Sequence, residues 1–243
     1  MGAVLSALAV LAAGFGAPAP CSAGIVIVPD DHPTVQLGID SGADTILVRA
    51  GTYAESPTMS AAPNRSRIVL MADPAASPRP TLQGLAVSIL DHDTGDLNVV
   101  GLRVVNRVTV RTHRVIASYR FEACLLEDGL WHGGPPPAFD HAGGLTLLRC
   151  VIRGAVGMTV GSLTMESDTV NAVGGMSFHA IDPIRVSNCW FRDSPIGLEL
   201  FIRTGGASVE VVGSEFENCD IGLRVTDNDN SALVLVQKNR TQN

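Results

Sequence analysis

Four residues in the second half of the chain have types and spacing suited to binding chemistry. Arg153, Asn171, Trp190 and Arg192 each follow an inward apolar residue of a recurring phrase, so strand alternation points them outward. An exposed indole offers a flat apolar surface to the C–H face of a sugar ring, while guanidinium and amide groups hydrogen-bond sugar hydroxyls. The spacing therefore predicts a glycan-binding groove on one face of the protein.

Two outward rows are expected to make up this face. One row reads Leu125, Val151, Thr169, Trp190 and Glu215, and the next reads Glu127, Arg153, Asn171, Arg192 and Glu217. A second interpretation stays open. In it, residues 132–142 fold over Leu125 and Val151, and the charged side chains form only solvated ion-pair ladders.

A loop between two copies of the phrase holds a second group of candidates. His132, Asp140 and His141 border a run that contains three consecutive prolines, which predicts a protruding and partly rigid loop. Two imidazoles beside a carboxylate could transfer protons or bind a metal, whereas loop histidines without a fixed partner are usually only solvated. We assign the three residues to substrate binding and expect no metal site.

Asp168 takes the place of a cysteine at an inward position of the phrase. Burial there would raise the pKa of its carboxyl, a property that catalytic acids share. The interpretation that we favour is structural, with the side chain capping backbone groups at a corner near Ser167.

The phrase that positions these residues has the form apolar-x-apolar-x-x-small-x-apolar and returns after roughly 20–25 residues. Alternation on both sides of a corner describes two short strands that meet at a bend. A glycine and another alternating pair follow, and the glycine is expected to supply a positive φ. Three short strands per coil predict an all-β solenoid. The glycines are Gly157, Gly175, Gly197 and Gly222.

Three of the 5 cysteines share one position of the phrase, namely Cys124, Cys150 and Cys189. Stacked coils would place Cys124 and Cys150 about 4.8 Å apart. Because their Cβ vectors would be parallel, we expect buried free thiols, with a Cys124–Cys150 disulfide as the alternative.

Composition narrows the classes of function. A chain of 243 residues can bury a large core, and only 5% of its residues are aromatic, which suits stacked aliphatic strands. The net charge of −7 argues against a general binder of nucleic acid or anionic membranes, although a local basic patch remains compatible with it.

Residues 1–23 are predicted to be a secretory signal peptide, because an apolar run from Val4 to Phe15 precedes the small residues Cys21-Ser-Ala23. No Lys or Arg precedes that run, and a buried N-terminal helix is the alternative. The run is too short for a stable transmembrane anchor. We therefore expect a secreted protein, extracellular or periplasmic, with a strand and capping helix in residues 24–44 and the solenoid in residues 45–243.

The stretch from Pro33 to Glu55 carries a family resemblance. Thr34 is expected to cap a short helix, which a strand and the turn Gly51-Thr-Tyr53-Ala-Glu55 follow. This order resembles the opening of the pectin-lyase-like superfamily, whose members are right-handed parallel β-helix proteins with a small helix over the first coil. The resemblance extends from Gly24 onward and implies the same fold here, a right-handed parallel β-helix with a short N-terminal capping helix.

The resemblance brings no catalytic residues with it. Leu90-Asp-His-Asp93 is similar to a segment of pectate lyases, but the clustered Ca²⁺ ligands and the arginine base of those enzymes are missing. The signatures of pectinesterases and polygalacturonases are missing as well. We expect no cofactor, with Ca²⁺ at Asp91–Asp96 or Asp227–Asn230 as a minor alternative.

Two functions follow as hypotheses. The first is an exported protein that binds extracellular polysaccharide, a cell-surface glycan or another surface partner along one solenoid face. The second is a polysaccharide lyase or glycoside hydrolase that acts on the same face. The last coil is unfinished after Leu233, which predicts either end-to-end self-association or a longer chain.

Overall fold

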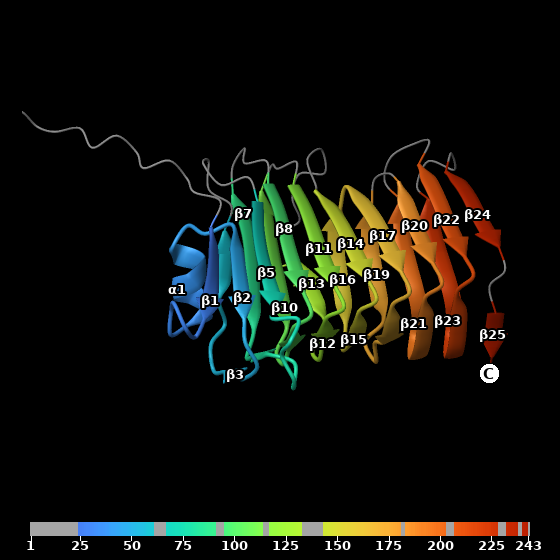
Figure 1. Cartoon of the computed structure of the whole chain (residues 1–243). Coiled ribbons are helices and arrows are strands. Elements are labelled where there is room, and N and C mark those ends of the chain that lie inside the picture. The colour runs from blue at the N-terminus through green and yellow to red at the C-terminus, as the bar shows by residue number, and fades with distance from the viewer. Residues whose placement is uncertain are drawn as a thin grey trace, which may run out of the picture.

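The computed structural model describes residues 24–60, 67–90, 95–113, 117–132, 143–180, 183–202, 207–227, 232–237 and 240–242. In these residues the chain forms a parallel β-solenoid of about 7 turns with one short helix, which confirms the predicted all-β class. Figure 1 shows the strands stacked from α1 at one end to β25 at the other. The signal-peptide prediction falls on residues 1–23, outside the described residues.

One side of the solenoid is a 10-stranded parallel sheet, which we call series A. Its strands are β1 (Ile25–Val28), β2 (Thr45–Val48), β5 (Arg67–Ala72), β8 (Gly95–Val100), β11 (Ala117–Glu122), β14 (Gly144–Leu148), β17 (Ser162–Glu166), β20 (Ile184–Ser187), β22 (Ser208–Val212) and β24 (Leu233–Gln237).

The remaining strands form a 15-stranded sheet that consists of two series. Series B contains β3 (Thr52–Tyr53), β6 (Thr81–Leu82), β9 (Arg103–Val104), β12 (Leu125–Leu126), β15 (Val151–Arg153), β18 (Thr169–Asn171) and β25 (Arg240–Gln242). Series C contains β4 (Thr58–Ser60), β7 (Leu85–Leu90), β10 (Val108–His113), β13 (Leu130–His132), β16 (Val156–Val160) and β19 (Met176–Ala180). The long strands β21 (Trp190–Ile202) and β23 (Glu215–Asp227) run through both series.

Inward side chains stack in continuous rows because the strands are parallel and in register. One row of series A has no member more than 1% exposed, and it is made of aliphatic residues, one Phe and one Met. Such a row buries apolar surface at every coil, which is the main stabilising contribution to the fold. Its members are Ile46, Leu70, Val99, Phe121, Leu147, Met165, Val186 and Val211.

From Gly101 to Gly213, the corner between series A and series B turns through one residue with a positive φ in each coil. Non-glycine residues occupy this left-handed position at Ala123, Arg149, Ser167 and Asn188, with φ between 52° and 57°. The residue after each of these corners points inward, and we call these buried residues, Cys124, Cys150, Asp168 and Cys189, the cysteine row. The corners therefore stack as regularly as the strands. Backbone bonds such as Val151 N to Cys124 O, at 2.8 Å, link the successive corners.

Helix α1 (Val35–Asp40) covers the first coil. Its N-cap is Thr34, as the sequence predicted, and the Thr34 side chain accepts the N–H of Leu37 at 3.2 Å. Glu55 caps the same end, because its two carboxylate oxygens accept the N–H groups of Val35 and Gln36 at 2.7 and 3.1 Å. The Glu of the Gly-x-Tyr-x-Glu turn is therefore a structural residue that ties the second coil to the helix.

At the opposite end, every side chain of β24 is exposed. Val234 and Val236 continue the inward rows of series A, yet they are 41% and 50% exposed. Self-association at this end stays a prediction.

Candidate functional site

The outward surface of series B, which we call face B, carries the row that the sequence predicted. Register pairs Leu125 with Val151, Val151 with Thr169, Thr169 with Trp190, and Trp190 with Glu215. In the neighbouring row, Arg153 pairs with Asn171 and Arg192 pairs with Glu217. Four of the predicted site residues therefore lie on one face: Arg153, Asn171, Trp190 and Arg192.

Charged groups on face B are largely paired with one another. Glu127 accepts from Arg103 Nε at 3.0 Å and from Arg153 Nη1 at 2.8 Å. Arg192 lies 3.3 Å from Asp193, and Asn218 donates to the other oxygen of Asp193 at 3.1 Å. The Glu127–Arg153 half of the expected ladder is present, whereas Arg192 pairs within its own coil.

The Trp190 ring on face B is covered on one side. The guanidinium carbon of Arg192 lies 4.7 Å from the ring centroid, which is a cation–π distance. Only 37% of Trp190 is exposed. A sugar stacking on this ring would have to approach the remaining surface or displace the guanidinium.

His132 lies on the other outward surface, that of series C, which we call face C. It ends strand β13, whose partners are β10 and β16, so it is not a neighbour of the Arg153 row. Burial lowers the pKa of His132, and its imidazole is therefore neutral near pH 7. Asp140 and His141 lie outside the described residues, so the proposed grouping of the three residues stays a prediction.

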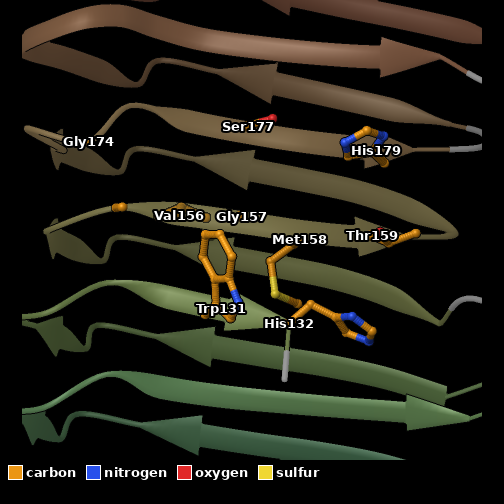
Figure 2. Close-up of a pocket in the computed structure, with 10 residues that line it drawn as sticks. Trp131, His132, Val156, Gly157, Met158, Thr159, Gly174, Ser177 and His179 are labelled. Carbon is orange, nitrogen blue, oxygen red and sulfur yellow. The ribbon is translucent and has the colours of Figure 1, made fainter. Parts of the chain in front are cut away.

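Face C is hollowed beside His132. The groove has a volume of about 400 Å³ and crosses strands β13, β16 and β19. Figure 2 shows Trp131 lying across the strand that carries Gly157, with His132, Thr159 and His179 toward one end of the groove. Met158 and Ser177 also line it.

The indole of Trp131 depends on the glycine beneath it. A Cβ atom placed on Gly157 would lie 2.5 Å from Cζ3 of the Trp131 ring. The missing side chain therefore lets the ring lie flat on the neighbouring strand, where 45% of Trp131 stays exposed. The guanidinium carbon of Arg107 lies over the Trp131 ring, 5.6 Å from its centroid, which is also within cation–π range.

The far end of the groove presents an aromatic pair. His179 stacks on Phe201 of the next coil, with ring centroids 4.6 Å apart and planes inclined by 10°. Thr159 is the register partner of His179 and Ser177 is that of Gly157. The imidazole of His179 and the hydroxyl of Thr159 thus lie at one end of the groove, and the Ser177 hydroxyl lies nearer to the indole at the other end. Such a groove is able to hold a ligand with both apolar and hydroxyl surface.

Of the residues that line the groove on face C, sequence reasoning assigned only His132 to a site, and it placed Gly157 at a corner. Of the four glycines expected to have a positive φ, the structure gives one only to Gly175, at 83°. Gly157 lies inside β16, between the buried residues Val156 and Met158. The alternation Val156-x-Met158-x-Val160 was the signal that marks Gly157 and Thr159 as outward.

The inward cysteine row is formed as predicted. Cys124, Cys150 and Cys189 are buried free thiols, and Asp168 occupies the coil between the last two. The hydrogen bond to Cys124 and burial raise the pKa of the Cys150 thiol. Burial also raises the pKa of Cys189, to about 12. These thiols lie inside the solenoid and contribute nothing to either face.

The described residues contain neither a candidate metal cluster nor a membrane-spanning helix. The described part of the chain holds no group of three or more His, Cys, Asp or Glu side chains arranged to bind a metal. The two acidic stretches considered for Ca²⁺ lie partly outside the described ranges, so that alternative is untested. Among the described residues, no helix has the length and apolar character to cross a bilayer.

Known proteins give no guide to this site. Neither protein-family models, nor curated proteins, nor solved structures showed a match to the chain.

Proposed function

We propose that the protein is a non-catalytic glycan-binding solenoid whose ligand lies in the groove on face C. The observation that carries this proposal is the Trp131 ring, which is 45% exposed and lies over a glycine that has no side chain to lift it. A flat and accessible indole is the surface on which the C–H face of a sugar ring packs.

The other lining groups suit sugar hydroxyls. The neutral imidazole of His132 can donate or accept a hydrogen bond, and the hydroxyls of Thr159 and Ser177 can do both. A few polar groups around an apolar floor are typical of small-ligand sites. The groove crosses three coils, so a chain of several sugar units would contact more of it than a monosaccharide.

Face B supports the proposal less well. Arg192 lies closer to the Trp190 ring, at 4.7 Å, than Arg107 lies to the Trp131 ring, at 5.6 Å, and Trp190 is the less exposed of the two. Glu127 on face B is already shared between two arginines. Hydrolysis or lyase chemistry remains the alternative function, but the described lining of the groove contains no carboxylate, whereas glycoside hydrolysis uses two.

We also infer that the solenoid is right-handed and related to the pectin-lyase-like β-helices, and that it is exported. The support for the relationship is the Glu55-capped helix over the first coil together with parallel strands in three series. The support for export is the apolar segment within residues 1–23. Export would place the groove where extracellular polysaccharides are available.

The test compares two tryptophans on different faces. Binding of a panel of soluble polysaccharides is measured by calorimetry for the full chain, for Trp131→Ala and for the matched variant Trp190→Ala. We expect Trp131→Ala to weaken the best ligand about tenfold or more, and Trp190→Ala to leave its affinity unchanged. The reverse pattern would move the site to face B. Release of reducing ends or unsaturated products from any polysaccharide would replace binding by catalysis.

A further inference from the structure

A second hollow lies on face B, nearer to α1 than the predicted Trp190 site. It has a volume of about 410 Å³ and is lined by Thr52, Thr81, Arg79, Arg103, Leu125, Gly51 and Pro78. Register makes Thr52, Thr81, Arg103 and Leu125 successive members of one outward row. Two hydroxyls, a guanidinium and an alkyl group are thus stacked along four coils, with a second guanidinium beside them.

The positive charge of this hollow is cancelled only in part, because Arg103 has an ion-pair partner, Glu127. Arg79 is exposed, and within the described ranges no carboxylate lies at ion-pair distance from it. Arg103 is bonded to Glu127 through its Nε–H only, which leaves its two terminal nitrogens to face other groups. Glu127 in turn divides its charge with Arg153, whose Nη1 lies 2.8 Å from the second carboxylate oxygen. A chain with a net charge of −7 therefore presents a local surplus of guanidinium groups here.

We propose that this hollow is an oxyanion site, which binds a carboxylate, sulfate or phosphate group of an organic ligand. Guanidinium groups offer paired N–H donors that match two oxygens of such a group, and the Thr52 hydroxyl can supply a further donor. Thr81 helps to fix the site, because its hydroxyl donates to the backbone oxygen of Arg79 at 3.4 Å. The side chains of Leu125 and Pro78 give the ligand an apolar wall.

This site shares no residue with the groove on face C, so each proposal can fail without the other. The probes are inorganic sulfate, inorganic phosphate, and glucuronate beside its uncharged counterpart glucose. Each is titrated into the full chain by calorimetry and by thermal unfolding at two salt concentrations. The variants are Arg79→Gln and, as the matched control, Arg185→Gln, whose side chain is 65% exposed on series A.

We expect at least one of the oxyanions to bind saturably to the unchanged protein. Its affinity should fall about tenfold in Arg79→Gln. Its affinity for Arg185→Gln and for Trp131→Ala should equal that for the unchanged protein. Higher salt should weaken the binding, because exposed charges are screened. If sulfate or phosphate bound and glucuronate did not, the site would be specific for tetrahedral oxyanions. Equal binding of glucose and glucuronate, unchanged affinity in Arg79→Gln, or no saturable binding of any oxyanion would overturn the proposal.

Discussion

The carboxylate of Asp168 accepts the backbone N–H of Cys150 in the preceding coil, at 2.7 Å. Ser214 does the same for Cys189 at 3.2 Å, so a polar residue in the cysteine row ties its own corner to the corner before it. Asp168 is only 1% exposed, and its second oxygen has no hydrogen-bond partner among the described residues. Burial raises the pKa of this carboxyl to about 7.

The first prediction concerns how stability depends on pH at Asp168. Because its folded-state pKa lies above the ordinary value of 3.8, the native state binds a proton more tightly than the unfolded state does. The contribution of Asp168 to stability is therefore fully present below about pH 4 and is lost as pH rises through 7. In Asp168→Asn this loss is absent. Relative to the unchanged protein, the free energy of unfolding of the variant should therefore rise between pH 4 and pH 8, by about 4 kcal/mol at most.

The measurement is urea unfolding of both proteins at several pH values. The two proteins differ by one carboxyl group. The pH dependence of the difference between their free energies of unfolding therefore reports on Asp168. Cys189→Ala serves as the control, because it alters the same row without adding or removing a carboxyl. A difference that stays constant across the pH range would show that Asp168 is not held in its neutral form.

The second prediction concerns the buried hydroxyl of Tyr119. This side chain lies in an inward row between Leu97 and Leu145 and is 2% exposed. In the described part of the chain, its hydroxyl has no hydrogen-bond partner. Removing an unsatisfied buried hydroxyl relieves its desolvation penalty, so Tyr119→Phe should be as stable as the unchanged protein or up to about 1 kcal/mol more stable.

Tyr53→Phe is the matched comparison for Tyr119→Phe. The hydroxyl of Tyr53 donates to the backbone oxygen of Arg49 at 3.1 Å, and its loss should lower stability by about 1 kcal/mol. Chemical denaturation of the two variants provides the test. If Tyr119→Phe lost as much as Tyr53→Phe, the buried hydroxyl would have a partner after all.

The third prediction concerns the carboxylate that caps helix α1. Glu55→Ala leaves the N–H groups of Val35 and Gln36 without their acceptor and should cost about 1–2 kcal/mol. Glu166→Ala, at an exposed strand position, should change stability by less than about 0.5 kcal/mol. Thermal unfolding monitored by circular dichroism compares the two, and equal losses would contradict a capping role for Glu55.

The fourth prediction concerns the glycine under Trp131. The Cβ of Gly157→Ala would lie 2.5 Å from the ring, so the indole must move off the floor of the groove. We expect a shifted tryptophan emission maximum and a glycan affinity reduced about tenfold. In the control Gly51→Ala, the new Cβ would lie 3.5 Å from the Tyr53 ring, which is an ordinary contact distance. The emission maximum and the glycan affinity should both stay unchanged in this variant. A Gly157→Ala protein with normal glycan binding would remove Trp131 from the site.

Several features of the fold could be predicted from the sequence because they depend on alternation. Trp190 and Arg192 were expected to be outward, and Cys150 and Asp168 inward, and the structure confirms these directions. In a strand, successive side chains point to opposite faces, so buried apolar residues reveal the direction of their neighbours. The N-cap at Thr34 could also be predicted, because an N-cap depends on residues within a few positions of it in the sequence.

The site on face C was not predictable in the same way. If Gly157 and Gly175 occupied equivalent positions in neighbouring coils, Thr159 would lie beside Ser177. In the structure, Thr159 lies beside His179. This is a shift of two residues, which leaves every inward residue inward and therefore changes no apolar pattern. Coil lengths also vary, so the phrase alone could not detect the shift.

The sequence by itself determined that the chain stacks into coils and which side chains face the core, because burial of apolar residues imposes a period of two on each strand. Only the tertiary structure decided which side chains of successive coils are neighbours, and hence that Trp131 lies on Gly157 and Arg103 shares a hollow with Arg79. Those neighbours are set by the backbone hydrogen bonds between strands distant in sequence, which hold the register and depend little on the identity of the outward residues.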